Sequence, residues 1–297
     1  MSEQLTISEH FKHSGLPITV AWRDPQPDFP LHQHSFSELI LIYRGNAVHQ
    51  VDDLSFPVSA GDIFVISGRR KHRFVDTNDL ALVNVIFSPE LLNMNEWDIS
   101  DLPGFRAMFM LEPEYREKHQ FKSRLELSGN ELRKTMSVIR RLSDEIECEA
   151  PGFKLDAKAI LMRLLVYIAR CYEKNAKTNP HTMSLLRIAM AIDYLDKHYL
   201  EEIDYKELGR IASMSQRHFQ RIFRHALNCT ARQYVIQLRI RKAMRLLRET
   251  SRSVSEIAFE CGFDDSNYFS RLFHKYSGTT PLKYREVYSV FSIATRN

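Results

Sequence analysis

Hydrophobic and polar positions follow different patterns in the two halves of the chain. From Phe29 to Ser88, short runs rich in Val, Ile and Phe, such as SELILIYRG and LALVNVIF, are separated by Gly, Asn and Asp. Short apolar runs between turn residues are typical of strands, so this region predicts a small β-barrel or sandwich. From Leu132 onward the apolar residues instead recur every three or four positions, which is the spacing of a helix.

Two helices are predicted in the middle of the chain. The first has its apolar residues inside a charged segment, at Leu132, Met136, Ile139, Leu142 and Ile146. The second runs from about Leu155 to Glu173 and is more continuously apolar. Both helices cover the open side of the barrel, or the first forms a dimer interface. The polar segment NAKTNPHTM that follows lacks periodicity and contains Pro180, so it is predicted to be a linker.

The C-terminal third contains an internal repeat of about 50 residues. Residues 207–234 and 256–284 align so that aromatic, basic and threonine positions coincide, as in Phe219 with Phe269, Arg221 with Arg271 and Tyr234 with Tyr284. Each copy predicts two helices joined by a short turn, and the stretch Thr230 to Glu249 predicts a helix that connects the copies. Two helix-turn-helix units on one connecting helix can place two recognition helices on one face of a DNA duplex.

Capping residues locate the second helix of each copy. In the first copy the turn falls at Ser213 to Ser215, and Ser215 can cap the helix. In the second copy Gly262 permits a tight turn, and Asp264 or Asp265 is the expected cap. The outward faces of the two helices carry side chains that hydrogen-bond bases and phosphates, and the predicted DNA-binding residues are Gln216, Arg217, Gln220, Arg221, Arg224, Ser266, Asn267 and Arg271.

Positive charge is concentrated in the same third of the chain. The formal net charge is +4 for 297 residues, but residues 184–288 hold 18 Lys and Arg against 12 Asp and Glu. The stretch from Leu208 to Arg248 has ten basic residues and no acidic one. A solvated helical face usually mixes both signs, whereas a polyanion relieves the self-repulsion of a single sign. The charge pattern therefore favours a nucleic-acid partner.

The region from about Leu186 to Val287 resembles the DNA-binding domain of the AraC/XylS family of bacterial transcription regulators. The resemblance is strongest in SVSEIAFECGFDDSNYFSRLFHKYSGTTPLKYR. It implies seven helices that read two successive major grooves. The residues that it implies face DNA are Gln216, Arg217, Gln220, Arg221, Ser266, Asn267 and Arg271. The first copy departs from the family at Asn228, where a glycine usually ends the helix. Because Asn also adopts the left-handed conformation, we expect the same fold there.

The N-terminal strands carry two motifs similar to those of cupins. His32, His34, Glu38 and Gly45 have the spacing of the first motif, and the stretch from Pro57 to Asp62 followed by His72 resembles the second. The second motif departs at Ser67 and Arg69, where cupin enzymes usually have Pro and Gly. The family regulators carry such a barrel, so the two halves of the chain agree.

Four barrel residues have three possible roles. His32, His34, Glu38 and His72 can line a pocket that binds a small-molecule effector, which is the role we favour, or they can be structural polar residues. They can also hold a metal ion with open positions, as in a metal-dependent cupin enzyme. Because the regulators' barrels often keep these residues without a metal, we expect no metal and no cofactor. The basic stretch from Arg69 to His72 favours an anionic or hydroxyl-rich ligand, or is only a solvated loop.

Composition narrows the class of protein further. A content of 44% hydrophobic and 26% charged residues is ordinary for soluble domains. No apolar run is long enough to span a membrane and the N-terminus lacks a signal-peptide pattern, so we expect a cytoplasmic protein without a membrane partner. The cysteines lack metal-ligand spacing and are expected to be small buried residues, Cys148, Cys171, Cys229 and Cys261.

These observations predict an α+β, ligand-responsive transcription regulator that is not an enzyme. The expected layout is a cupin-like effector-binding barrel (1–125), a helical dimerisation segment (126–174), a linker (175–184), a DNA-binding domain (185–288) and a tail (289–297). The helix-turn-helix units are expected at about 205–227 and 254–276. The expected partners are promoter DNA, a second copy of the chain, the effector and, as the resemblance implies, RNA polymerase. The layout is similar to the rhamnose-operon regulators, which makes an activator that responds to a sugar the leading hypothesis; the alternative is a metal-dependent cupin enzyme fused to a DNA-binding domain.

Overall fold

The computed structural model describes residues 3–5, 11, 15–26, 29–67, 70–90, 92, 98–115 and 122–289. Contacts divide the chain into two units, Met1–Ala189 and Met190–Asn297, each with its own hydrophobic core. The first unit combines a sheet with helices and the second is all helical, which confirms the predicted α+β class. In the part of the chain that is described, every helix is too short or too polar to cross a membrane.

The described residues of the first unit form one sheet of eight strands. The strand order is β1-β3-β7-β4-β6-β8, with β2 paired to β7 and β5 paired to β4. All described pairings are antiparallel except that of β1 with β3. The strands are β1 (Glu3–Leu5), β2 (Ile18–Arg23), β3 (His32–His34), β4 (Ser37–Val51), β5 (Leu54–Ser59), β6 (Asp62–Ile66), β7 (His72–Phe87) and β8 (Leu125–Glu126).

The long strands β4 and β7 pair from end to end and bend together. The first half of β4 also pairs with β6, and its second half pairs with β5. The register between β4 and β7 shifts at several points between Ile42 and Val48, and such bulges bend a sheet. Gly45 lies in this bend with a φ of 73°, and an added Cβ would lie 2.2 Å from the carbonyl oxygen of Asp79. Only glycine fits there, so this residue permits the two halves of the sheet to fold toward each other.

The sheet is not closed in the described residues, so the predicted barrel-like unit is a folded, open sheet. The path of paired strands ends at β1 and β8 in the described residues. These end strands have three and two residues. A closed barrel needs every strand to find partners on both sides, and such short ladders cannot supply them.

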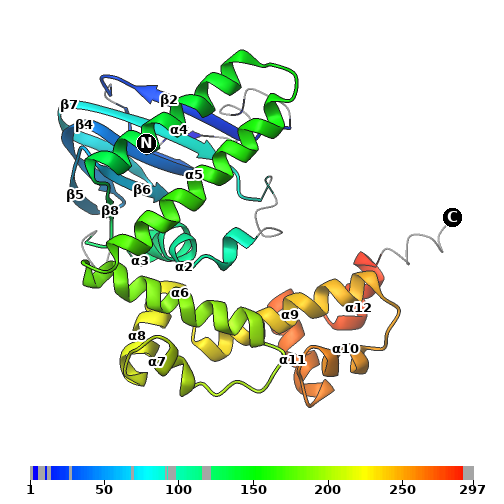
Figure 1. Ribbon diagram of the computed structural model, residues 1–297. Helices are drawn as coiled ribbons and strands as arrows, with labels where there is room; N and C mark the ends of the chain where they lie inside the picture. The colour runs from blue at the N-terminus through cyan, green and yellow to red at the C-terminus, as the bar shows by residue number, and fades with distance from the viewer. Residues whose placement is uncertain are drawn as a thin grey trace. The chain divides into compact units, whose positions relative to one another are not determined.

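Both faces of the folded sheet are covered. The inner face forms a core with Ile40, Phe56, Phe64 and Leu82, which come from four strands. The outer face is crossed by helices α4 (Gly129–Cys148) and α5 (Phe153–Asn175), as Figure 1 shows. Short helical turns join β7 to β8: η2 (Asp98–Asp101), α2 (Pro103–Phe105), η3 (Arg106–Leu111) and α3 (Glu112–Tyr115).

Helices α4 and α5 confirm the two helices predicted from periodicity. Glu131 in the first turn of α4 accepts hydrogen bonds from the backbone N–H of Ser128 and from Lys174 near the end of α5. The bonds from Lys174 and Ser128 lower the pKa of Glu131 to about 2. The Trp22 indole on β2 donates to Ser143 on α4 over 3.1 Å, so the helix is attached to the sheet by a polar contact as well as by packing.

The segment predicted as a linker is mostly helical. Helix α6 (Pro180–His198) begins inside it, and the division between the two units falls within this helix. The side chain of Asn179 accepts hydrogen bonds from the backbone N–H groups of His181 and Thr182, which is how a residue caps a helix. Pro180 therefore occupies the first helical position, where a proline is favoured, and does not break the chain.

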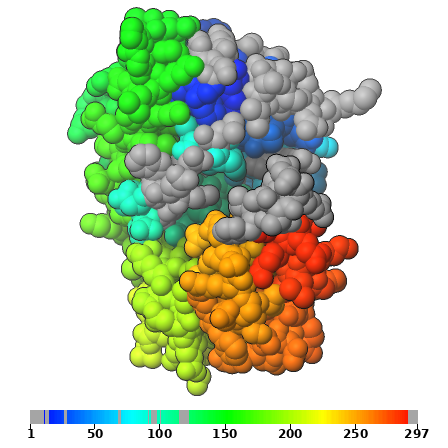
Figure 2. All heavy atoms as spheres, turned by 90° about the vertical axis from the view of Figure 1, so that its right-hand side faces the viewer, coloured from blue at the N-terminus to red at the C-terminus, as the bar shows by residue number. Residues whose placement is uncertain are grey.

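Seven helices, from α6 onward, lie in the described residues, as the resemblance implies. After α6 come α7 (Glu207–Ile211), α8 (Gln216–Leu227), α9 (Ala231–Glu249), α10 (Val254–Glu260), α11 (Ser266–Ser277) and α12 (Pro281–Tyr288). Residues of α9, α10 and α11 share one core. Figure 2 shows α9 to α12, orange to red, as one continuous block of atoms.

Only two of the four cysteines are fully buried, although all four were predicted to be. All four are free; Cys171 and Cys261 are buried, Cys229 is half-buried and Cys148 is exposed. Burial raises the pKa of Cys261 to about 11. Cys148 is the last residue of α4, beyond the part of that helix that packs on the sheet, which explains its exposure.

Candidate nucleic-acid interface and buried histidine cluster

The first helix-turn-helix unit consists of α7, a short turn and α8. The turn includes Ser213 in the left-handed conformation, with a φ of 48°. The side chain of Ser215 accepts a hydrogen bond from the backbone N–H of His218, which confirms the predicted cap of α8. Asn228 ends the helix with a φ of 53°, so it takes the left-handed conformation expected in place of glycine.

Helix α8 presents one polar face and one apolar face. Phe219, Ile222, Phe223 and Ala226 are at most 2% exposed and pack inward. The five residues predicted to face DNA are all exposed: Gln216, Arg217, Gln220, Arg221 and Arg224. A guanidinium nitrogen of Arg221 lies 3.1 Å from Nδ1 of the half-buried His218, which restricts where this arginine can point.

The second unit repeats this arrangement with α10 and α11. Gly262 in the turn has a φ of 79°, and an added Cβ would lie 2.9 Å from the carbonyl oxygen of Leu200. Asp265, one of the two expected caps, accepts from the backbone N–H groups of Asn267 and Tyr268. Asn267 and Arg271 are exposed, whereas Ser266 is half-buried.

Some of the ten basic residues between Leu208 and Arg248 are paired within the protein. Arg239 on α9 donates to the backbone carbonyl oxygens of Tyr199, Glu201 and Gly262. Three more basic residues of the stretch pair with glutamates: Arg210, Lys242 and Arg245. The other six are exposed and supply the positive surface: Arg217, Arg221, Arg224, Arg232, Arg241 and Arg248.

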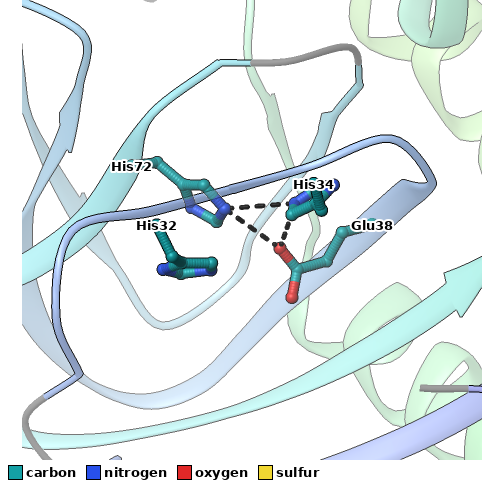
Figure 3. Close-up of side chains that lie close together, drawn as sticks. All are labelled: His32, His34, Glu38 and His72. Atoms are coloured by element: carbon teal, nitrogen blue, oxygen red, sulfur yellow. Dashed lines mark hydrogen bonds and ion pairs between the residues drawn. The ribbon is translucent and has the colours of Figure 1, made fainter. Parts of the chain in front are cut away.

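The four barrel residues singled out by their spacing do come together. His32 and His34 lie on β3, Glu38 on β4 and His72 at the start of β7, where it pairs with His32. All four are buried, with between 1% and 9% of each residue exposed. One ligand atom from each lies within 4.8 Å of the others. Figure 3 shows the four side chains converging from three strands.

Contacts within this cluster are short. His34 Nε2 lies 3.3 Å from Glu38 Oε2 and 3.2 Å from His72 Nε2, and His72 Nε2 lies 3.5 Å from the same Glu38 oxygen. His34 Nδ1 donates to the carbonyl oxygen of Phe36 at 2.9 Å, and the two rings stack. Packing and hydrogen bonds therefore hold the imidazoles in fixed orientations.

Sequence reasoning missed a fifth member of this group. His49 on β4 is fully buried, and its Nε2 lies 3.4 Å from Nδ1 of His72. The alternation of buried Ala47, His49 and Val51 along β4 is the signal that places it on the inner face. Arg69, one of the departures from the second motif, lies outside the described residues, and Arg70 pairs with Asp52 and Glu114.

Asp62 of the second motif has a structural partner. Its carboxylate accepts from Arg124 at 2.9 Å and from the backbone N–H of Ser59 at 2.8 Å. Burial nevertheless raises the pKa of Asp62 above its usual value. This residue closes the turn between β5 and β6 and attaches the segment before β8 to the sheet.

Two family descriptions match the chain. Residues 17–165 match an AraC-like ligand binding domain, and residues 208–286 match a helix-turn-helix domain. The first match spans the folded sheet apart from β1, together with α4 and the first half of α5. The second match spans both helix-turn-helix units.

The chain is also similar to transcriptional activators along nearly its whole length. It is 33% identical over 301 residues to the HTH-type transcriptional activator RhaR of Cronobacter sakazakii, covering 96% of this chain and 98% of that protein. RhaR of Mannheimia succiniciproducens is 31% identical over 287 residues, with the same coverage. Among solved structures, the DNA-binding domain of AdpA in complex with a target DNA is 32% identical, with a TM-score of 0.33, and covers 34% of this chain and 92% of that one.

Proposed function

This chain belongs to the AraC family of transcription regulators, and we propose that it activates transcription at a promoter when a small molecule binds its N-terminal unit. The observation that carries the proposal is the repeated recognition helix, whose apolar face is buried in both copies while its polar face is exposed. A purely structural pair of helices has no need to repeat such a polar face. The relatives are named as activators, so we take the protein not to be an enzyme.

DNA contact is assigned to the outward faces of α8 and α11. Arginine pairs with guanine and asparagine or glutamine with adenine in the major groove. Arg221 and Arg271 occupy matching positions, so each is assigned one contact in its own groove. Ser266 is half-buried and next to the Asp265 cap, so its assigned contact is to the phosphate backbone at the start of α11.

The effector is assigned to the sheet of the first unit. Its proposed contacts are four of the polar side chains gathered on the inner face: His32, His34, Glu38 and His72. A sugar is the leading candidate, because the layout of the chain is similar to that of the rhamnose-operon regulators. Binding changes transcription only if the effector favours one arrangement of the chain over another.

A homodimer through α4 completes the proposal. Half-buried Leu132 and Met136 on α4, with Tyr43 of β4, line a groove of about 570 Å³ on the surface of the first unit. An antiparallel copy of α4 would cover these apolar side chains. Two chains would then bind two halves of a repeated promoter site, and contact with RNA polymerase would complete activation.

The DNA assignment is tested by the salt dependence of binding. Bound duplexes are first selected from a random pool with the full chain, and affinity is then measured by fluorescence anisotropy. Six to ten phosphate contacts would lower affinity by about 10³–10⁵-fold between roughly 50 and 200 mM salt. A flat response would exclude DNA as the partner. Arg170→Ala on α5 removes an exposed arginine outside the interface and should leave the response unchanged.

The effector assignment is tested by thermal stability. The full chain is screened against a library of sugars, and a ligand at about 100 times its Kd stabilises the native state by about 2.7 kcal/mol. A sugar that raises the Tm should also change affinity for the selected duplex. A library without any stabilising sugar would exclude this class of effector.

A further inference from the structure

Three side chains of the buried histidine cluster direct their ligand atoms at one common position. His34 Nε2, His72 Nε2 and Glu38 Oε2 form a triangle with edges of 3.2, 3.3 and 3.5 Å, drawn as dashed lines in Figure 3. The point equidistant from these atoms lies about 1.9 Å from each, and zinc bonds to such atoms are about 2.0–2.2 Å long. An ion slightly out of the plane of the triangle would therefore meet all three at normal bond lengths.

Backbone carbonyls determine which nitrogen of two histidines faces the cluster. Nδ1 of His34 donates to the carbonyl oxygen of Phe36, and Nδ1 of His32 donates to that of Pro30 at 3.1 Å. A neutral imidazole carries only one proton, so Nε2 of each ring presents a lone pair. Histidines that bind metals are commonly oriented in this way, by a hydrogen bond from the other ring nitrogen.

The same contacts place hydrogen-bond acceptors against each other. The lone pair of His34 Nε2 lies 3.3 Å from the Glu38 carboxylate, with the two residues 1% and 4% exposed. Acceptors in contact inside a protein repel unless a proton or a cation lies between them. A proton on Nε2 of His72 relieves the two edges that meet at this atom and leaves His34 against Glu38, whereas one divalent cation relieves all three edges.

We propose that the buried histidine cluster binds one divalent transition-metal ion through His34, His72 and Glu38, with His32 as the fourth ligand. His32 offers an atom within the same 4.8 Å group. Three nitrogens and one carboxylate suit zinc, cobalt, nickel or ferrous iron, whereas magnesium and calcium prefer oxygen ligands. The proposal thus departs from the expectation from sequence that this site has no metal.

The ion also defines the chemical class of the effector, and this part of the inference rests on the proposed function. Four protein ligands leave one or two positions open on an ion that accepts five or six. Oxygen atoms of the effector would occupy these positions, as two adjacent hydroxyl groups of a sugar can.

The test measures metal binding by the full chain without an effector. The purified protein is stripped with a chelator and titrated with Co²⁺ or Zn²⁺, and binding is followed by metal content, by the visible absorption of Co²⁺ and by Tm. We expect one equivalent per chain, a rise in Tm and no response to Mg²⁺. Less than a tenth of an equivalent of Co²⁺ and of Zn²⁺ would overturn the proposal.

Variants assign the binding to this cluster. His34→Gln and Glu38→Gln should weaken Co²⁺ binding by at least about 100-fold, since even second-shell changes cost about 10–100-fold. His198→Gln removes an exposed histidine at the end of α6 that pairs with Glu201, and it should bind like the unchanged protein. Glu38→Gln keeps the shape of the side chain, and a far-ultraviolet circular-dichroism spectrum equal to that of the unchanged protein shows that it is folded. Equal Co²⁺ binding by Glu38→Gln and the unchanged protein would overturn the assignment.

The effector is then tested separately on the stripped and the metal-loaded protein. A sugar that raises Tm only in the loaded protein supports both the metal site and its role. A sugar that raises Tm equally in both forms overturns the role of the ion and leaves the proposed function standing. Metal binding without any sugar response supports the site and counts against the sugar.

Discussion

The two helix-turn-helix units share their interior far more closely than their exterior. In the first, Phe219 and Phe223 lie 5.3 Å apart between ring centroids, and Tyr234 meets Phe223 edge-on at 80°. In the second, Phe269 and Phe273 lie 5.6 Å apart, and Tyr284 meets Phe273 at 79°. The repeat is thus a repeat of packing, in which three aromatic rings anchor each recognition helix to the helix that follows it.

The two helix-turn-helix units differ in the charge of their exposed faces and in the caps of their helices. The outward face of α8 carries three arginines and no acid, whereas α11 begins at a carboxylate cap, Asp265, and presents Arg271 as its predicted arginine. The first helix of the second unit is capped by Ser253, and the hydrogen bonds from Ser253 lower the pKa of Glu256. In contrast, α7 has no side-chain cap. The aromatic residues are thus held by packing, whereas the exposed faces of the two units differ.

Removing one of the repeated aromatic rings should have the largest effect on the free energy of unfolding. Phe223→Ala and Phe273→Ala each leave a cavity at a residue that is at most 1% exposed, and each should cost about 3–5 kcal/mol. Hydrogen exchange should show faster opening of α8 in the first variant and of α11 in the second. Phe259→Ala, at a ring that is 60% exposed, should cost less than about 0.5 kcal/mol. If Phe223→Ala opens α11 as much as α8, the two units are one cooperative body.

Removing the matching arginines should have the next largest effect. Arg221→Ala and Arg271→Ala should each weaken binding to the selected duplex by about 1–3 kcal/mol, if each reads a guanine. Each should also relax specificity at one base, and the two bases should lie in different subsites. Binding to a panel of single-base variants measures this. Equal weakening on every sequence would identify a phosphate contact instead.

Removing the N-terminal caps of the two recognition helices should have a smaller effect on stability. Ser215→Ala and Asp265→Ala each remove an acceptor for N-terminal backbone N–H groups, and each should cost about 0.5–2 kcal/mol. Asp265→Asn keeps an acceptor oxygen and should retain most of the stability. Thermal unfolding at fixed salt compares the three variants. An Asn variant as unstable as the Ala variant would mean that Asp265 acts through its charge.

Exchanging the helix ends should have the smallest effect. Asn228 and Gly278 both end their helices in the left-handed conformation, with φ values of 53° and 75°. Asn228→Gly and Gly278→Asn should each change stability by less than about 1 kcal/mol, because both residues tolerate this conformation. An added Cβ at Gly278 meets nothing within 4 Å, so its cost is conformational alone. A loss of several kcal/mol in Gly278→Asn would contradict that account.

Much of the all-helical unit, Met190–Asn297, could be predicted from the sequence because its signals are local. The cap at Ser215, the left-handed Asn228 and the turn at Gly262 each depend on a few neighbouring residues. The convergence of His32, His34, Glu38 and His72 came from motif spacing. His49 was missed because its place beside His72 depends on the pairing of β4 with β7, and the bend at Gly45 depends on the same long-range pairing. Pro180 was misread because a proline at a helix start and one in a loop look alike in sequence.

Arg239 has a consequence for the spacing of the DNA site. By donating to carbonyl oxygens of the chain before α7 and of the turn before α11, it ties these two segments to the 19-residue helix α9, which spans about 28 Å. These bonds therefore favour a fixed distance between the two recognition helices. Each base pair inserted between the two subsites rotates one of them by about 35° around the duplex, given 10–10.5 base pairs per turn. Under the proposed function, promoters that contact both recognition helices must keep their two subsites in one helical phase.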